Sequence, residues 1–218
     1  SRFVEALRRM GGARDAQGHH ALPAVRVMQE VVQGKSGYLL EVGGERYWMR
    51  LQVDLGPEEG VAVKTRPDFL LTPVRSTSPR KSIAVYADGW ADHQNCLRED
   101  ARKRSALVAS GRYWVWSVTW TDVEAALASG LETDLDLQAG HARLDVGHAL
   151  VAQASLALGV PAADRNENAV AGLLRWLAMP CAEGEDTGLA RLQHQAAMLA
   201  ARLIVPPGSG DQAVASQA

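Results

Sequence analysis

The chain has 218 residues, of which 47% are hydrophobic and 22% are charged, and its formal net charge is −2. These values are typical of a folded domain with one sizeable core and room for a small second unit. The charge excludes a molecule that is basic over its whole surface. Any contact with nucleic acid must therefore come from a local basic patch, and segment 98–104 is the clearest one.

The remaining bulk features favour a cytoplasmic protein without a membrane segment. The only cysteines, Cys96 and Cys181, are far apart in the sequence, which argues against a disulfide framework. No apolar run approaches the roughly 20 residues that span a bilayer. The chain opens at Ser1 in an expected helix, which indicates a piece of a larger protein. No phosphate-binding glycine loop with a following Lys occurs, so an ATP-driven motor of the parent protein would lie outside this chain.

In chain order, the patterns of apolar, glycine and β-branched residues predict an α/β fold. Ser1 caps a first helix, and Gly43-Gly44 forms the turn of a hairpin. Helices are predicted over 1–10, 22–32, 97–110 and 121–128. Strands are predicted over 37–42, 46–55, 69–73, 83–86 and 113–120.

Beyond residue 130 the composition shifts to Ala and Leu, without a strand-like run. We therefore expect a domain boundary near 130–140, a helical region over 140–205 and a disordered tail over 206–218. Helices are predicted in this part over 141–158, 166–178 and 187–204.

Two carboxylates stand at the ends of the two apolar strands. Asp68 follows Pro67, which favours an extended chain, and Asp88 closes the strand that begins near residue 83. Pairing of these strands would bring Asp68 and Asp88 into one cleft. Because neighbouring carboxylates repel unless a cation lies between them, the pattern predicts a site for Mg²⁺ or Mn²⁺. The alternative for each residue is a carboxylate that caps a turn.

Further candidate residues follow Asp88. His93 is interpreted as a general base or acid, and its alternative is an ordinary surface histidine. In the helix over 97–110, Asp100, Lys103 and Arg104 share one face. Lys103 and Arg104 would contact DNA phosphates with Asp100 orienting them, or Asp100 and Arg104 would form an ion pair on a solvated surface.

Three tryptophans and two polar residues have simpler interpretations from composition alone. Trp114, Trp116 and Trp120 are expected to lie mostly in the core, and only an exposed one would indicate base stacking. Glu5 and Gln52 are expected at the surface or the edge of the sheet.

Taken together, the order of these motifs resembles one nuclease family. The motifs are Arg66-Pro67-Asp68-Phe69, then Asp88-Gly89 with His93, then Asp100-xx-Lys103-Arg104-xx-Leu107-xxx-Gly111, then Trp120-x-Asp122-Val123. Segment 66–123 resembles the PD-(D/E)xK nuclease superfamily, and in particular the branch of the very-short-patch repair endonucleases. Together with Glu5 and Gln52, the resemblance covers roughly residues 1–128.

The resemblance implies a restriction-endonuclease-like fold over 1–130, with a mixed central sheet flanked by helices, and Mg²⁺-dependent hydrolysis of DNA. Asp68 matches the metal-binding carboxylate, and Glu5 matches a first-helix Glu that acts through water. His93 matches the downstream His of the branch. The acidic position of the (D/E)xK half-motif falls on Tyr86 and the Lys position on Asp88, which departs from the pattern.

Similar domains occur at the C-terminus of large DEAD/DEAH-box helicase-like proteins, including bacterial phage-defence proteins. The resemblance therefore implies DNA and a helicase or ATPase module as partners, with Gln52 among the residues that contact DNA. The departure at Tyr86 supports an alternative, a nuclease fold that no longer cuts and serves as a DNA-binding or scaffolding module. A third interpretation is a protein-interaction domain that uses the helices over 140–205.

Overall fold

In the computed structural model, residues 1–14, 18–32, 34–74, 80–88, 97–128 and 168–179 are described. Their strands form one sheet in the order β1-β2-β3-β4-β5-β6, in which all neighbours are antiparallel except the parallel pair β5 and β6. The strands are β1 (Val25–Val32), β2 (Lys35–Val42), β3 (Glu45–Leu51), β4 (Phe69–Pro73), β5 (Ser82–Asp88) and β6 (Tyr113–Thr119). The helices are α1 (Arg2–Met10), the 3₁₀ helix η1 (Pro57–Glu59), α3 (Leu97–Ala109), α4 (Trp120–Ala128) and α6 (Ala169–Leu177). The predicted mixed α/β sheet flanked by helices is therefore confirmed.

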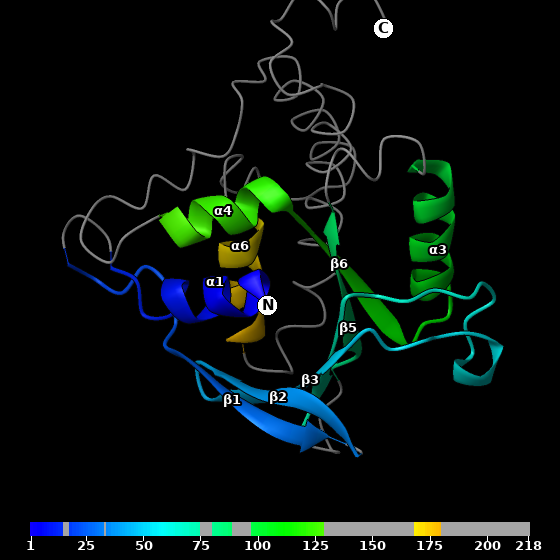
Figure 1. The fold of residues 1–218 in the computed structure, drawn as a ribbon, viewed down its shortest axis with the longest axis horizontal. Coiled ribbons are helices and arrows are strands. Elements are labelled where there is room, and N and C mark those ends of the chain that lie inside the picture. Colours follow the sequence, from blue (N-terminus) through cyan, green and yellow to red (C-terminus); the bar gives the residue numbers. More distant parts are fainter. Residues whose placement is uncertain (15–17, 33, 75–79, 89–96, 129–167, 180–218) are drawn as a thin grey trace, which may run out of the picture.

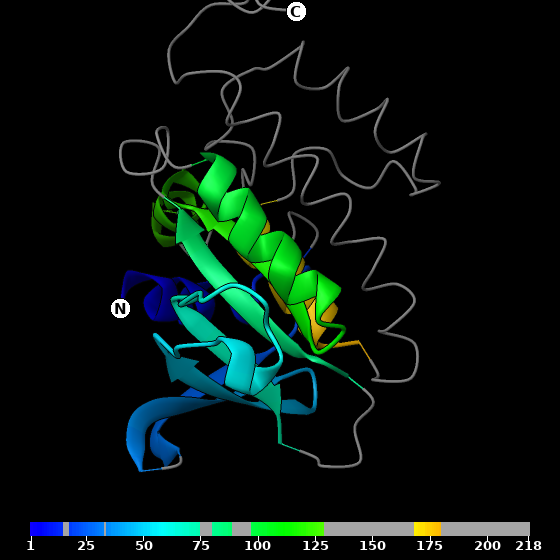
Figure 2. The same ribbon diagram turned by 90° about the vertical axis from the view of Figure 1, so that its right-hand side faces the viewer.

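Helices cover both faces of the sheet. Helices α1, α4 and α6 lie on one face and α3 lies on the other (Figure 1), and Figure 2 shows α3 running along the direction of β5. The alternation of side chains in the strands explains the two cores. Along β4, Phe69 and Leu71 enter the core under α1, α4 and α6, whereas Leu70 enters the smaller core that includes Leu107 of α3.

The predicted hairpin is confirmed and the predicted helix over 22–32 is wrong. Gly43 and Gly44 form the turn with φ values of 56° and 93°, which glycine adopts without steric cost. The segment predicted as a helix is β1, which pairs with β2 over its whole length, from Val25 opposite Val42 to Val32 opposite Lys35. Its β-branched valines favour a strand, and pairing with the hairpin outweighs the helix-like spacing.

Helix α6 packs inside the core of the sheet, which differs from the expectation of a separate helical region. Trp176 is fully buried, and its ring stacks on Trp116 of β6 with centroids 5.5 Å apart. The Trp116 indole donates a hydrogen bond to the carbonyl of Ala169 at 2.9 Å, and the Tyr47 hydroxyl donates one to the carbonyl of Leu177 at 2.8 Å. Both ends of α6 are thereby bonded to the strands beneath it.

A buried arginine completes the C-terminal end of α6. Arg80 is 4% exposed and lies just before β5. Its guanidinium donates to the carbonyls of Leu177 at 3.1 Å and Met179 at 2.7 Å, and it also contacts the Tyr47 hydroxyl. Carbonyl groups at a helix end lack partners within the helix, and a cation there is favourable. Arg80 therefore supplies the partners that this buried helix end needs.

Within the described ranges, no helix has the length and apolar character required to cross a membrane. The helices predicted over 141–158 and 187–204, the tail over 206–218 and both cysteines lie outside the described residues.

Candidate active site

Asp68 lies where the start of β4 meets the end of β5. The strands are antiparallel, with Phe69 opposite Val85, so the residue before β4 lies beside the last residues of β5. The Asp68 Oδ2 atom accepts a hydrogen bond from the backbone N–H of Ala87 at 2.8 Å. Asp88, the next residue, ends β5 opposite Thr119 of β6. The backbone of Asp88 and the carboxylate of Asp68 thus lie at the same end of the sheet.

A pocket of about 500 Å³ opens beside this carboxylate. Its walls come from the starts of α1, β4 and α4 and from the ends of β3 and β5. Asp68, Gln52 and Trp120 all line it, and we call it the Asp68 pocket. It brings together residues from five elements at one end of the sheet.

Gln52 stands in a strained conformation at the edge of this pocket. Its φ of 45° lies in the left-handed region, and it is the one non-glycine residue with positive φ among the described residues. Its backbone N–H donates to the carbonyl of Asp68 at 2.9 Å. Its carbonyl and its side-chain Oε1 accept from the Arg66 guanidinium at 3.2 Å and 3.4 Å. These bonds hold Gln52 between the two residues that flank Pro67.

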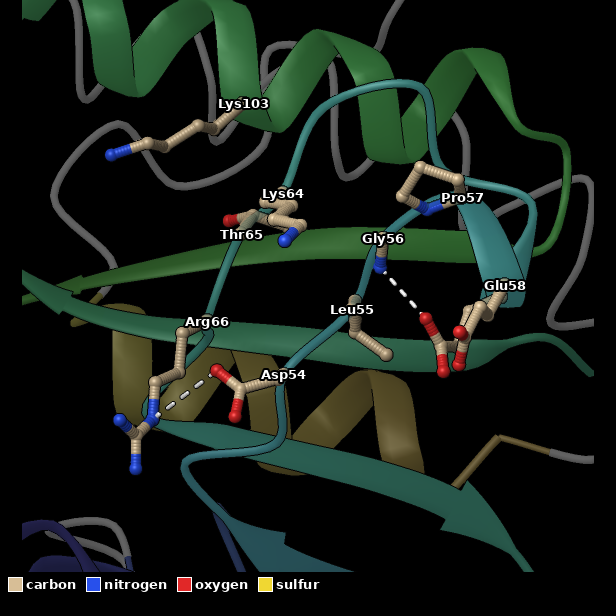
Figure 3. A pocket seen from close by; sticks show the side chains of 10 residues that line it. Asp54, Leu55, Gly56, Pro57, Glu58, Lys64, Thr65, Arg66 and Lys103 are labelled. Carbon is tan, nitrogen blue, oxygen red and sulfur yellow. Dashed lines mark hydrogen bonds and ion pairs between the residues drawn. The ribbon is translucent and has the colours of Figure 1, made fainter.

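A second pocket of about 710 Å³ lies next to this segment, and its lining has three basic side chains, Lys64, Arg66 and Lys103, and three acidic ones, Asp54, Glu58 and Glu59. Figure 3 shows Lys103 on α3 together with Lys64 and Arg66, which lie on the stretch between η1 and β4. We call this the Lys103 pocket. Acidic groups balance two of these charges, because Arg66 lies 3.7 Å from Asp54 and Lys103 lies 2.6 Å from Glu99. Such exposed pairs are weak and can exchange partners with an incoming phosphate.

Tyr86 occupies the position that the resemblance gives to a second acidic ligand. Its hydroxyl forms a hydrogen bond with Thr65 Oγ1 at 2.6 Å, and the Arg104 guanidinium carbon lies 4.9 Å from the centroid of its ring. The ring packs against the core on the α3 face. Tyr86 therefore contributes packing and a cation–π contact here, and it adds no carboxylate oxygen.

Nearby, the pKa of Tyr113 at the start of β6 is raised by burial, and the Glu59 carboxylate adds to this effect. The Tyr113 phenol is therefore neutral at physiological pH and contributes no negative charge near the Lys103 pocket.

The structure separates the other predicted site residues. Glu5 is exposed on α1, where its carboxylate lies 3.6 Å from Arg8, and it is not among the described residues that line the Asp68 pocket. On α3, Lys103 reaches the Lys103 pocket, whereas Arg104 lies on the Tyr86 ring. The predicted shared face of α3 thus packs largely on the sheet.

Two predictions concern groups that the structure does not describe. His93 lies outside the described residues, and for Asp88 the backbone alone is described. Asp100 lies on α3 and is partly buried, and its predicted orienting role stays a prediction.

Sequence reasoning missed the contributions of Lys64 and Trp120 to these pockets. Lys64 belongs to a loop with no recognisable pattern, so its place beside Lys103 depends on the tertiary fold. Trp120 stands at the junction of β6 and α4. The aromatic strand before it favours burial, and the change from strand to helix at this residue leaves it exposed.

Asp68 is the carboxylate that the described lining of the Asp68 pocket offers to a cation. Within the described ranges, no three His, Cys, Asp or Glu side chains cluster as a metal cage. Mg²⁺ in phosphate-processing sites is commonly held by one or two carboxylates, by waters and by substrate phosphates. Asp68 would supply one such carboxylate, since it lines the pocket beside the end of β5.

No family model matches this chain, and no curated protein or solved structure matches it.

Proposed function

We propose that this chain is a metal-dependent endonuclease domain that hydrolyses phosphodiester bonds in DNA. The observation that carries the proposal is the hydrogen bond from the Ala87 N–H to the Asp68 carboxylate at 2.8 Å. This bond holds a carboxylate at the end of β5, beside an open pocket and next to the backbone of Asp88. The family resemblance supports the same assignment.

The proposed site divides its work among three groups of residues. Asp68 and Asp88 would hold Mg²⁺ or Mn²⁺, which when bound supplies a Lewis acid for the phosphoryl oxygen. Lys64, Arg66 and Lys103 would bind flanking phosphates from the Lys103 pocket. In the reaction a water oxygen would bond to phosphorus, with His93 as the proposed acceptor of the water proton. The bond to the leaving sugar oxygen would break, and that oxygen would take a proton from solvent water to leave as a hydroxyl.

Nicking of supercoiled plasmid in Mg²⁺ or Mn²⁺ tests this proposal. Asp68→Asn keeps the size of the side chain and removes its charge, so we expect cleavage to fall at least about 100-fold, as for loss of one strong transition-state contact. The control is Glu30→Gln, the same kind of change on an exposed residue of β1, which should cut like the wild type. Equal cleavage by wild type and Asp68→Asn, or no cleavage in any metal, contradicts the proposal.

A second candidate is a nuclease fold that binds DNA or scaffolds a helicase without cutting. Tyr86 favours it, because the phenol is held by Thr65 and Arg104 where a carboxylate ligand is expected. Calorimetric titration with Mn²⁺ separates the two candidates. The nuclease should bind the ion and lose this binding in Asp88→Ala, whereas the binding module should bind DNA in a salt-dependent manner without measurable uptake of the ion.

The proposed partner is a helicase-like ATPase in the same parent protein or complex, on the resemblance alone. Cleavage by that assembly should depend on ATP hydrolysis, and equal cleavage with and without ATP would count against the partnership.

A further inference from the structure

Trp120 is an exposed aromatic residue at the candidate active site. It is 55% exposed, whereas Trp114, Trp116 and Trp176 are 7%, 3% and 0% exposed. It lines the Asp68 pocket together with Leu51, which is 38% exposed. These two are among only four exposed large apolar side chains in the described part of the chain. Two exposed apolar side chains therefore lie beside Asp68 in this pocket.

Neighbouring residues hold the Trp120 ring in place. The Arg2 guanidinium carbon lies 5.6 Å from the ring centroid. Its Nε donates to Glu124 Oε1 of α4 at 2.7 Å, which fixes the guanidinium over the ring. The indole is thus next to a cation, and more than half of the surface of Trp120 faces solvent.

Packing of α1 against α4 does not require Trp120 to be exposed. A cation–π contact between α1 and α4 needs one face of the ring, and it does not need a tryptophan that keeps more than half of its surface in water. An exposed aromatic side chain is a surface on which a nucleobase can stack, because every base presents a π-face, and a neighbouring arginine adds a cation–π contribution. In a duplex each base is already stacked on both faces. A duplex base reaches such a surface only after its base step is unstacked, whereas an unpaired base reaches it directly.

We propose that Trp120 stacks on an unpaired nucleobase of the substrate, next to the phosphodiester that Asp68 serves. The inference rests on the proposed function and specifies its substrate as DNA with a single-stranded nucleotide at the cut site, as in a single strand, a flap or a loop. The strand then passes from Trp120 over Asp68 toward the cations of the Lys103 pocket, because both pockets border segment 65–68.

The test measures binding without metal, so that it does not depend on cleavage. In EDTA, fluorescence anisotropy of a labelled oligonucleotide should show that Trp120→Ala weakens single-strand binding about 5- to 150-fold, the range for loss of one stacked base. Binding to a blunt duplex should change by less than about twofold, and Trp120→Phe should keep most of the affinity. Val108→Ala, which truncates an exposed apolar residue on α3, is the control and should bind like the wild type.

Cleavage in Mg²⁺ and binding in EDTA, both measured for Asp68→Asn, separate this inference from the nuclease proposal. Asp68→Asn should lose cleavage in Mg²⁺ and keep the Trp120-dependent binding in EDTA. If Trp120→Ala leaves single-strand binding unchanged, or weakens single-strand and duplex binding equally, stacking is excluded even where the wild type cuts DNA. If the wild type binds no single strand at all, the inference is also overturned. A circular dichroism spectrum and a melting temperature that match those of the wild type establish that Trp120→Ala is folded.

Discussion

At the scale of single residues, Gln52 joins backbone strain to the candidate site. Its φ of 45° is unfavourable for a side chain with a Cβ atom, by roughly 1–2 kcal/mol. Its bonds to Asp68 and Arg66 hold it there. Strained residues of this kind persist where the surrounding structure fixes them, and they often lie at functional sites.

The strain predicts an unusual order of stability for two variants. Gln52→Gly and Gln52→Ala both remove the side chain, and only glycine relieves the left-handed conformation. We expect the glycine variant to be more stable than the alanine variant by about 1 kcal/mol in urea denaturation. In an ordinary extended segment alanine is the more stable of the two, so that order would exclude strain at this position. Both variants lose the contact of Arg66 with the amide, and both should cut DNA more slowly than the wild type.

The sequence predicted that Asp68 and Asp88 lie at strand ends, and the strand pairing confirms this for their backbones. Pro67 and the two apolar strands that follow it predicted that Asp68 and Asp88 lie at one end of the sheet, because antiparallel pairing brings the start of one strand beside the end of the other. The conformation of Gln52 and the exposure of Trp120 depend on contacts between distant segments. The exposed position of Glu5 follows from how α1 packs, since Phe3, Leu7 and Met10 face the core and direct Glu5 to solvent.

At the scale of elements, one buried carboxylate connects β6, α4 and α6. Asp122 is fully buried, and its Oδ2 accepts from the backbone N–H and the hydroxyl of Thr119. Its Oδ1 accepts from the N–H of Ala169 at 3.2 Å, while its carbonyl accepts from the Asn168 side chain at 2.8 Å. Asn168 in turn accepts from Val170 and caps α6. The start of α6 therefore depends on a residue of α4.

This network predicts a large effect from a small substitution. Asp122→Asn keeps the shape of the side chain and replaces one of its acceptor oxygens by an NH₂ group. This group then faces a donor of Thr119 or Ala169. We expect the free energy of unfolding to fall by about 2 kcal/mol, since bonds to a buried charged group are lost and one donor becomes unsatisfied. Glu124→Gln, on the same helix, weakens only the exposed pair with Arg2 and should cost less than about 1 kcal/mol. Equal effects of the two substitutions in urea denaturation would contradict the role of Asp122.

Most elements could be predicted because they carry local signals. Gly43-Gly44 marks the hairpin turn, and the aromatic and β-branched residues of β6 favour a strand. The exception is β1, whose residues Val25, Met28 and Val32 also fit a helical spacing. Its strand conformation is determined by pairing with β2, a contact that local patterns do not contain.

At the scale of the whole molecule, the core extends beyond the boundary predicted near 130–140. Seven residues of α6 contribute to the same hydrophobic core as the sheet, namely Ala169, Val170, Ala171, Leu173, Leu174, Trp176 and Leu177. Each large apolar side chain contributes about 1.5–3 kcal/mol when it is fully buried. The combined contribution of the apolar side chains of α6 is comparable with the whole free energy of unfolding of a typical domain, which is about 5–15 kcal/mol.

A truncated chain that ends at residue 130 should therefore fail to fold cooperatively. It lacks α6, so Trp116 and the neighbouring core surface of β6 are exposed to water. The Asp122 carboxylate loses the N–H of Ala169, and the Arg80 guanidinium loses the carbonyl of Leu177. We expect a broad, non-cooperative melt by circular dichroism and binding of a hydrophobic dye. A chain that ends at residue 179 restores α6 and should unfold in one sharp transition. A sharp transition for the 1–130 chain at the melting temperature of the full chain would establish instead that the sheet and α1, α3 and α4 form an autonomous unit.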